Sequence, residues 1–459
     1  MNIKFQHRYA DLGRQFALPI LPEKVENPEV LLWTQPLAEE LGLDLSPSEQ
    51  ALYCSGQQLF EGSKPVAMAY AGHQFGHFNP QLGDGRAHLL GELENQQGQL
   101  QEIHLKGSGR TPFSRNGDGK CAIKPAVREY IMSEAMHALG VPTTRTLAVV
   151  TTSEELFRQQ PTTGAIVTRV ATSHLRVGTF EYFAARGMHS ELEQLIDLTI
   201  SRHYPHVDKK KPSKYINLLS QVINKQINLV VAWMRVGFIH GVMNTDNTLL
   251  SGETIDYGPC AMLGAYDPAT VFSSIDDQGR YAFANQPNIT HWNLARLAEC
   301  LIPLIDDNQQ EAIDAIMPVL NDFAPKFKSA YNLMMANKLG LKNASTKSIE
   351  LADEILSLTH QHRLDYTQTF NSLALTIGSL KSDEPGIHAG LKSWTSQWLA
   401  LVLGSNQSEQ ITKQQLLQYN PVVTPKNHHI EAVLSEVEND QQNTEQLKDF
   451  LKVLQSPYQ

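Results

Sequence analysis

Apolar and polar residues alternate along much of the first part of the chain, which predicts strands. The runs "AHLLGELEN" (87–95) and "QLQEIHLK" (99–106) follow the period of strands, and the QQG turn between them predicts a hairpin. The segment "KPAVREYIMSEAMHALG" (124–140) predicts a helix, with a proline near its start and a glycine at its end. Two further runs predict strands, "TRTLAVVTT" (144–152) and "GAIVTRVAT" (164–172). This order of elements is typical of a small mixed lobe.

After residue 178 the apolar residues follow a helical period instead. The segment "YINLLSQVINKQINLVVAWMRVGF" (215–238) predicts a long helix, and apolar residues with helical spacing recur to residue 403. We therefore expect an α+β fold with a strand-rich N-terminal lobe and a mainly helical C-terminal lobe. The predicted divisions are an N-terminal extension packed on the lobes (1–65), the N-lobe (66–177), the C-lobe (178–405) and a C-terminal extension (406–459).

Composition and charge exclude some classes of partner. Of the 459 residues, 41% are hydrophobic and 19% are charged, which is ordinary for a water-soluble globular protein. The formal charge of −10 argues against nucleic acid or an anionic membrane as the main partner. The chain shows neither a secretory signal nor an apolar run of the roughly 20 residues that span a bilayer, so we expect a cytoplasmic protein. Its four cysteines are widely spaced and predict no zinc site or disulfide framework.

The segment "HGVMNTDN" (240–247), followed by "TIDYGP" (254–259), has the order of a kinase catalytic centre. Kinases use the pattern H-R-D-x-x-x-x-N, in which the Asp is the base and the Asn holds a metal, and a later Asp holds the metals on the phosphates. Asn247 and Asp256 fill the two metal-binding positions, but Val242 stands where the base belongs. Asp246 lies directly before Asn247, and the kinase pattern assigns no function to this position.

Phosphate-binding candidates precede this segment in the order of a kinase N-lobe. The turn Gly83-Asp84-Gly85 comes before the predicted hairpin, and Lys106 ends its second strand. Glycine lets backbone N–H groups approach phosphate oxygens, and a cation offsets their charge. The helix offers two partners for Lys106, Glu129 and Glu134, and periodicity does not choose between them.

A second glycine-rich segment, "KGSGRTPFSRNGDGK" (106–120), follows at once and adds three cations and the pair Asp118-Gly119. Taken by itself it is as typical of an exposed loop as of a phosphate site. Arg169 and Arg176 lie near the predicted junction of the lobes, where the guanidinium fork suits phosphate oxygens. The histidines of "AGHQFGHF" (71–78) lack the glutamate of a zinc motif, so we interpret them as structural.

These strings together resemble the selenoprotein O family of kinase-fold protein adenylyltransferases. The resemblance is strong over roughly the first 270 residues and rests on "RYADLG", "AGHQFG", "QLGDGRA", "AVREYIMSEAMHALGVPTTRTLAVV", "HGVMNTDN" and "IDYGP". It implies a protein-kinase-like, two-lobed fold in which ATP lies reversed relative to kinases. AMP then passes to a Ser, Thr or Tyr hydroxyl of a protein, and pyrophosphate leaves. The missing kinase base is consistent with that different chemistry.

The resemblance also assigns functions to individual residues. It implies that Asp246 is the proton acceptor, that Asn247 and Asp256 bind Mg²⁺ or Mn²⁺, and that Glu129 pairs with Lys106. The implied nucleotide contacts are Gly83, Gly85, Arg86, Lys106, Asp118, Gly119, Arg169, Arg176 and Asp256. Many relatives carry a redox-active cysteine or selenocysteine near the C-terminus, whereas no cysteine follows Cys300 here. Regulation by such a cysteine is therefore not predicted for this chain.

Two other functions compete with protein adenylylation. The first is an ordinary kinase that transfers the γ-phosphoryl group, which the fold alone permits. Val242 at the position of the base argues against it. The second is a nucleotide-binding scaffold without turnover. The complete set of Lys106, Asn247 and Asp256 argues against that alternative, because a decayed site commonly loses such groups.

Overall fold

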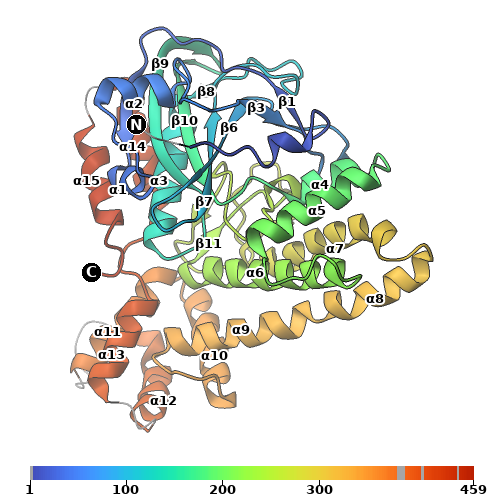
Figure 1. Cartoon of the computed structure of the whole chain (residues 1–459). Helices are drawn as coiled ribbons and strands as arrows, with labels where there is room; N and C mark the ends of the chain where they lie inside the picture. The colour runs from blue at the N-terminus through green and yellow to red at the C-terminus, as the bar shows by residue number, and fades with distance from the viewer. Residues whose placement is uncertain (1–3, 380–387, 405–407, 442–443) are drawn as a thin grey trace.

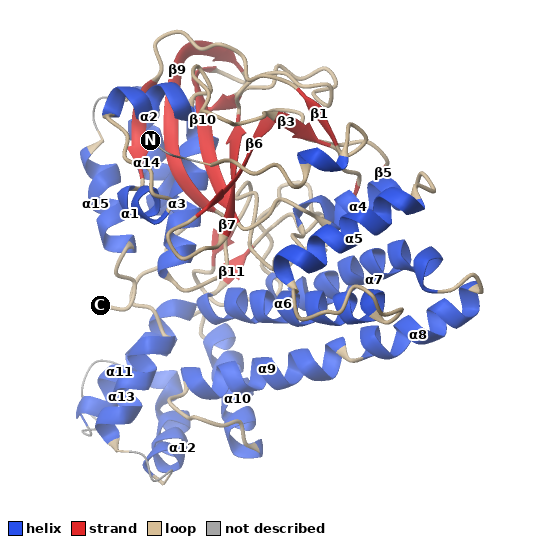
Figure 2. Cartoon of the chain, in the orientation of Figure 1, coloured by secondary structure: helices blue, strands red, loops and turns tan. Residues whose placement is uncertain are grey.

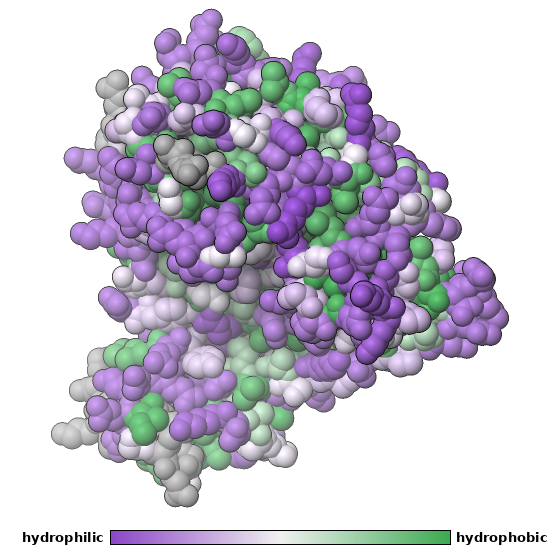
Figure 3. Space-filling model, viewed as in Figure 1, coloured by the Kyte–Doolittle hydropathy of each residue, from purple (hydrophilic) through white to green (hydrophobic). Residues whose placement is uncertain are grey.

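The computed structural model describes residues 4–379, 388–404, 408–441 and 444–459. A twisted sheet forms the upper part of the molecule, and long helices lie beneath it (Figures 1 and 2). The predicted strand-rich N-terminal part and helical C-terminal part are therefore confirmed. Within the described ranges, no helix is both long enough and apolar enough to cross a membrane. The face shown in Figure 3 is mainly hydrophilic, with small separate apolar areas.

The main sheet is antiparallel and has the order β1-β3-β6-β7-β10-β9-β2, with β8 paired to β10. The predicted hairpin 87–106 is present as β6 and β7, in which Glu94 pairs with Leu100. One edge strand, β2, comes from the N-terminal extension and pairs with β9, an addition that the sequence did not predict. The strands are β1 (Ala17–Pro19), β2 (Glu29–Trp33), β3 (Val66–Met68), β6 (Ala87–Glu94), β7 (Leu100–Lys106), β8 (Cys121–Ala122), β9 (Arg145–Phe157) and β10 (Pro161–Ala171).

Helices cover both faces of this sheet. In β9, Val149 packs in the same cluster as helix α3 (Ile123–Ala138), whereas Val150 packs with α1 (Gln35–Glu40) and α2 (Pro47–Cys54). Successive side chains of a strand point to opposite faces, so a strand that is apolar at nearly every position must be buried on both sides. The N-terminal extension thus supplies one cover of the sheet and α3 supplies the other.

The helical part positions the second half of the site. Helix α6 (Lys214–Val236) ends at Gly237, whose φ of 77° is the left-handed conformation that favours glycine at a helix end. The chain then enters the short strand β11 (Phe238–Ile239), which pairs with β12 (Ala261–Met262). The segment between these strands carries the predicted catalytic loop and Asp256. The remaining helices here are α4 (Val177–Ala184), α5 (His189–His203), α7 (Gln286–Ile305), α8 (Gln309–Asn321), α9 (Phe323–Lys338), α10 (Thr346–Gln361), α11 (Tyr366–Ser379), α12 (Lys392–Leu403) and α13 (Glu409–Tyr419).

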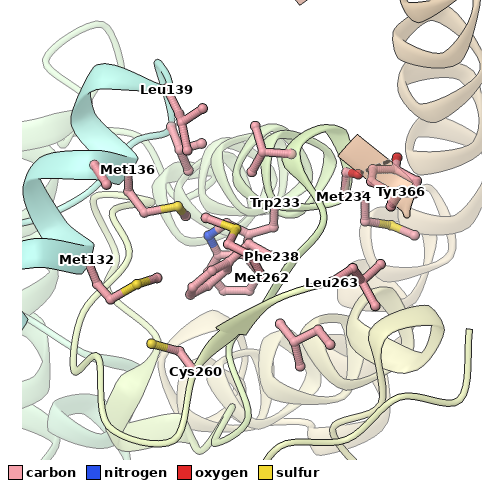
Figure 4. Close-up of a cluster of buried hydrophobic side chains, with 14 of the residues drawn as sticks. Met132, Met136, Leu139, Trp233, Met234, Phe238, Cys260, Met262, Leu263 and Tyr366 are labelled. Atoms are coloured by element: carbon pink, nitrogen blue, oxygen red, sulfur yellow. Dashed lines mark hydrogen bonds between the residues drawn. The ribbon is translucent and has the colours of Figure 1, made fainter. Parts of the chain in front are cut away.

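The last two helices, α14 (Asn427–Asn439) and α15 (Glu445–Leu454), return to the upper part of the molecule and lie beside α3 (Figure 1). A single apolar cluster joins them to α3, α6 and the β11–β12 strands. Figure 4 shows part of this cluster, in which Met132 and Met136 of α3 approach Trp233 of α6 and Phe238 of β11. The two parts of the molecule therefore share one continuous core behind the site.

Candidate nucleotide and metal site

A buried ion-pair network forms around Lys106 at the end of β7. Its ammonium lies 2.5 Å from Glu129 Oε2 on α3 and 2.9 Å from Asp256 Oδ1. Arg169 on β10 donates to the other oxygen of Glu129, at 2.8 Å from Nε and 2.6 Å from Nη2. Glu134, the alternative that the sequence left open, is bonded to Arg145 instead. The structure thus brings together three predicted residues from the N-terminal part and one from the C-terminal part.

The charges of this network determine the ionisation of its carboxylates. Burial alone favours the neutral acid, but Arg169 and Lys106 hold the pKa of Glu129 at about 2, against an ordinary value of 4.5. Lys106, followed by Arg169, likewise holds the pKa of Asp256 well below its usual range, although burial opposes this effect. Both carboxylates are therefore ionised at neutral pH. The side chain of Asp256 is 40% exposed, so it remains open to a ligand.

The backbone at Asp256 has an uncommon conformation. Its φ is 65°, in the left-handed region that aspartate tolerates better than most residues. Gly258 N–H donates to the Asp256 carbonyl at 2.8 Å, and the next side chain, Tyr257, is buried with its hydroxyl against Thr143. Unusual backbone conformations persist where the surroundings hold them, often at functional sites. Here the tight turn aims the carboxylate at Lys106.

The predicted catalytic loop is fixed by bonds that leave some oxygen atoms of the candidate metal ligands free. His240 donates from Nε2 to the carbonyl of Ile255, at 2.9 Å, which links the loop to the residue before Asp256. Asn247 donates its amide Nδ2 to the carbonyl of Val242 at 3.1 Å, which leaves Oδ1 available as an acceptor. Asp256 Oδ2 likewise accepts no hydrogen bond from the described residues. Two oxygen donors without such partners match the ligands that Mg²⁺ and Mn²⁺ prefer.

Asp246 lies in the short helix Thr245–Asn247 and is almost fully buried, with 8% of the residue exposed. Its Oδ2 accepts a hydrogen bond from Gln74 Nε2 at 3.2 Å, whereas Oδ1 has no partner. Burial raises the pKa of Asp246 to about 6, and the nearby Arg176 opposes this shift. A carboxyl group with this pKa is suited to accept a proton near neutral pH.

A small hairpin covers this carboxylate. It consists of β4 (Gly72–Gln74) and β5 (His77–Asn79), which contain the "AGHQFGHF" motif. A Cβ at Gly72 would lie 2.7 Å from Asp246 Oδ1, so any larger residue there would force the carboxylate or the hairpin to shift. His73 Nδ1 lies 2.5 Å from Glu181 Oε1, and the His73 backbone N–H donates to the Thr245 hydroxyl at 2.6 Å.

The sequence did not connect this hairpin to the catalytic loop. Gln74 and Asp246 are 172 positions apart, a separation that periodicity does not bridge. The function of Gln74 was missed for that reason. The nearest signal in the sequence was the pair of glycines in the motif, which permits a close approach to another segment. The contacts of His73 agree with the structural interpretation of this residue, and His77 lies exposed on β5.

The glycine turn is fastened to the second glycine-rich segment. Gly83 has a φ of 76°, and a Cβ there would lie 2.2 Å from the Phe113 ring. Gly85 accepts a hydrogen bond from the Ser114 hydroxyl at 2.5 Å. Between the glycines, the buried Asp84 accepts from the Met68 N–H and from His104 Nε2, both at 3.2 Å. Asp84 was not among the predicted site residues, yet it fixes the turn.

The predicted arginines occupy different surroundings. Arg176 is buried, stacks on the Tyr70 ring at 4.2 Å and donates to the Asp246 carbonyl at 3.2 Å. The side chain of Arg86 is exposed, and within the described ranges it has neither an ion pair nor a hydrogen bond. Arg176 is therefore held against the predicted catalytic loop, and Arg86 is free to meet an anionic ligand.

Asp118 and Gly119 lie apart from the Lys106 network. The carboxylate of Asp118 binds Arg158 through two bonds of 2.7 Å and 3.1 Å, near the β9–β10 turn. Gly119, with a φ of 73°, packs against the backbone of Gly109. In the described part of the chain, no hydrogen bond or ion pair joins either residue to Lys106 or Asp256. Their contact with a nucleotide stays a prediction.

No group of three or more His, Cys, Asp or Glu side chains in the described ranges is arranged to hold a metal ion. A site built from Asn247, Asp256 and phosphate oxygens does not need such a group of side chains. Mg²⁺ is commonly bound by one or two protein ligands, substrate phosphates and water. The donor set fits a hard cation that arrives with a nucleotide.

Comparison with known proteins also indicates that the protein uses a nucleotide. The family model described as "Protein adenylyltransferase SelO" matches residues 1–455. The chain is 49% identical to a "Protein nucleotidyltransferase YdiU" of Teredinibacter turnerae, over 100% of this chain and 95% of the relative. It is also 49% identical to the protein of that name from Pseudoalteromonas translucida, over 98% and 94% of the two chains. The Halalkalibacterium halodurans protein of the same name is 46% identical, over 99% and 92%.

Proposed function

Because the chain belongs to the SelO family of protein adenylyltransferases, we propose that Asp246 accepts the proton of the attacking hydroxyl and that ATP binds with its α-phosphate towards the protein substrate. The chain is an enzyme that transfers AMP from ATP to proteins, as the family and the relatives' names support. The kinase-like fold and the predicted family agree with this activity. The proposal concerns how the residues of the site perform it.

The observation that carries the proposal is the different position of the carboxylate in the predicted catalytic loop. Val242 occupies the position of the kinase base, whereas Asp246 is buried beside Asn247 with Oδ1 unpartnered. A base at that place suits an acceptor hydroxyl that attacks the α-phosphorus. The expected acceptors are Ser, Thr and Tyr hydroxyls.

The proposed step conserves atoms and charge. The hydroxyl oxygen forms a bond to the α-phosphorus while its proton passes to Asp246. The bond from the α-phosphorus to the bridging oxygen breaks, and pyrophosphate leaves with the electron pair. Lys106 and Arg169 stabilise the negative charge that develops on the leaving group, and Arg86 adds a third cation. These donors are already in place, so little reorganisation is needed during the step.

Asn247 and Asp256 are the residues that would hold Mg²⁺ or Mn²⁺, through Asn247 Oδ1 and the Asp256 carboxylate. The ion would supply positive charge to the phosphate oxygens. Lys106 holds Asp256 in the ionised form that such a ligand requires. Gly83 and Gly85 would let backbone N–H groups approach the phosphates.

Labelled ATP tests this proposal. The purified protein is incubated with Mg²⁺ or Mn²⁺ and ATP labelled at either the α- or the γ-phosphate, with Asp256→Ala as the inactive control. We expect α label on protein in the wild type and none in the variant. Incorporation of γ label alone would make the protein a kinase, and the absence of both labels would indicate a scaffold. Transfer at the wild-type rate by Asp246→Asn would exclude Asp246 as the base.

A further inference from the structure

Arg128 lies beside Glu129 on α3, and its side chain reaches the segment after Asp256. Its guanidinium donates to the carbonyl of Gly258 at 3.0 Å from Nε and to that of Cys260 at 2.5 Å from Nη2. Its side chain is only 11% exposed. One arginine thus holds two carbonyls within four residues of the proposed metal ligand.

The same guanidinium is held from behind by α14. It donates to Asn427 Oδ1 at 3.0 Å and to Glu431 Oε1 at 3.1 Å. These two residues are four positions apart and therefore share one face of α14. The planar fork of arginine can serve several acceptors in fixed directions, which a lysine ammonium cannot reproduce. The four bonds leave Arg128 little freedom to change its orientation.

Helix α14 is itself attached to both parts of the molecule. At its start, Lys426 contacts Asp365 Oδ2 at 2.9 Å and also the carbonyl of Leu263. Further along, Glu438 pairs with Lys124 of α3 at 2.5 Å. Apolar residues of α14 lie in the same core cluster as those of α3. The C-terminal helix therefore forms a bridge from the helical part to the helix that carries Glu129.

From this geometry we propose that Arg128 is a positioning residue that couples the docking of α14 to the placement of Asp256 and Glu129. Arg128 fixes the carbonyl of Gly258, and Gly258 N–H fixes the carbonyl of Asp256 at 2.8 Å. Because Arg128 and Glu129 are neighbours on α3, the same contact sets the position of the Lys106 partner. The inference rests on the proposed function for its catalytic consequence, but its structural claim concerns the turn at Asp256 and is independent of the reaction.

The chain offers a matched control. Lys124 lies one turn before Arg128 on α3 and also pairs with an acidic residue of α14. In the described residues it makes no hydrogen bond or ion pair with the segment from Asp256 to Cys260. Lys124→Ala therefore removes a docking contact alone, whereas Arg128→Ala removes a docking contact together with the support of the turn.

The experiment uses the full chain and three measurements on wild type, Arg128→Ala, Arg128→Lys and Lys124→Ala. These are hydrogen exchange of the peptide that contains residues 254–262, affinity for Mn²⁺ with ATP by calorimetry, and KM and kcat for α-label transfer. For Arg128→Ala we expect faster exchange in that peptide and a loss of about 10- to 100-fold in metal-nucleotide affinity or kcat, as is typical when a residue that supports a metal ligand is removed. We expect intermediate values for Arg128→Lys and wild-type values for Lys124→Ala.

Equal effects of Arg128→Ala and Lys124→Ala, or unchanged hydrogen exchange at 254–262 in Arg128→Ala, would overturn the inference. Arg128 would then only help to dock α14. If the wild type transferred no α label, the proposed function would fail. In that case, hydrogen exchange of residues 254–262 and metal-nucleotide affinity would still test whether Arg128 holds the turn at Asp256. A lower thermal stability of Arg128→Ala with unchanged exchange in the native state would also count against the inference.

Discussion

The substitution Glu129→Gln tests the buried network most directly. The carboxylate is 3% exposed and binds two cations, so removal of its charge leaves Lys106 and Arg169 without their shared counter-ion. The pKa of Glu129 is about 2 in the folded protein, against 4.5 ordinarily. Each pKa unit is worth about 1.4 kcal/mol, so this pKa difference corresponds to about 3 kcal/mol of stabilisation of the folded protein. A buried ion pair that loses one partner typically costs a similar amount, about 3–5 kcal/mol.

The pH dependence of this stabilisation has a definite sign. A carboxyl group whose pKa is lower in the folded state adds stability above its unfolded pKa, and that stability is lost as the pH falls towards the folded value. The difference between wild type and Glu129→Gln should therefore be full at pH 7. It should decrease below about pH 5 and reach roughly half by pH 3.

Urea unfolding followed by tryptophan fluorescence, from pH 7 to pH 3, measures this difference. Both proteins share the titrating groups outside this network, so the acid destabilisation that those groups cause cancels in the comparison. Glu134→Gln is the control on the same helix, since Glu134 binds Arg145 and does not contact Lys106. A difference for Glu129→Gln that stayed constant from pH 7 to pH 3, or that was under about 1 kcal/mol at pH 7, would refute the reasoning.

Three further predictions concern the loop, its cover and a buried histidine. Asp246→Asn should abolish AMP transfer and preserve metal-nucleotide affinity by calorimetry, and a large loss of affinity would contradict its assignment as the base. Gly72→Ala should lower kcat because its Cβ would lie 2.7 Å from Asp246 Oδ1, whereas Gly264→Ala, with no neighbouring atom within 4 Å, should not; equal rates would refute the steric argument. Burial lowers the pKa of His88 from 6.5 to about 4, so the wild type should lose stability from about pH 6.5 down to about pH 4. His88→Asn should give a flatter urea-unfolding profile across that range, and an unchanged slope would contradict the assignment.

The sequence predicted the elements whose contacts are local. The β6–β7 hairpin and α3 follow from alternation, helical period and turn residues, all of which act within about 20 positions. Periodicity left the partner of Lys106 open between Glu129 and Glu134, because a helix alone does not show what each face meets, and only the family resemblance favoured Glu129. The structure shows Arg145 opposite Glu134, and this contact leaves Glu129 to Lys106.

The elements that escaped prediction make contacts between distant segments. The pairing of β2 with β9 joins Val30 to Val150, and the hairpin at Gly72 covers Asp246. Neither contact changes the local pattern of the residues involved. Candidate metal ligands and the glycine turn could be proposed from the sequence because their chemistry restricts residue type. Gln74 and Arg128 make their contacts through position, and their residue types are ordinary in loops and helices.

The bridge from α14 to α3 has a consequence for synthesis. Arg128 and Glu431 are 303 positions apart, so α3 emerges from the ribosome long before its covering helix exists. At translation rates of about 5–20 residues per second, that interval lasts roughly 15 to 60 seconds. During it the apolar residues of α3 that later pack with Ile430 and Leu434 lack their cover. The nascent N-terminal part therefore offers a binding surface to chaperones until the end of translation.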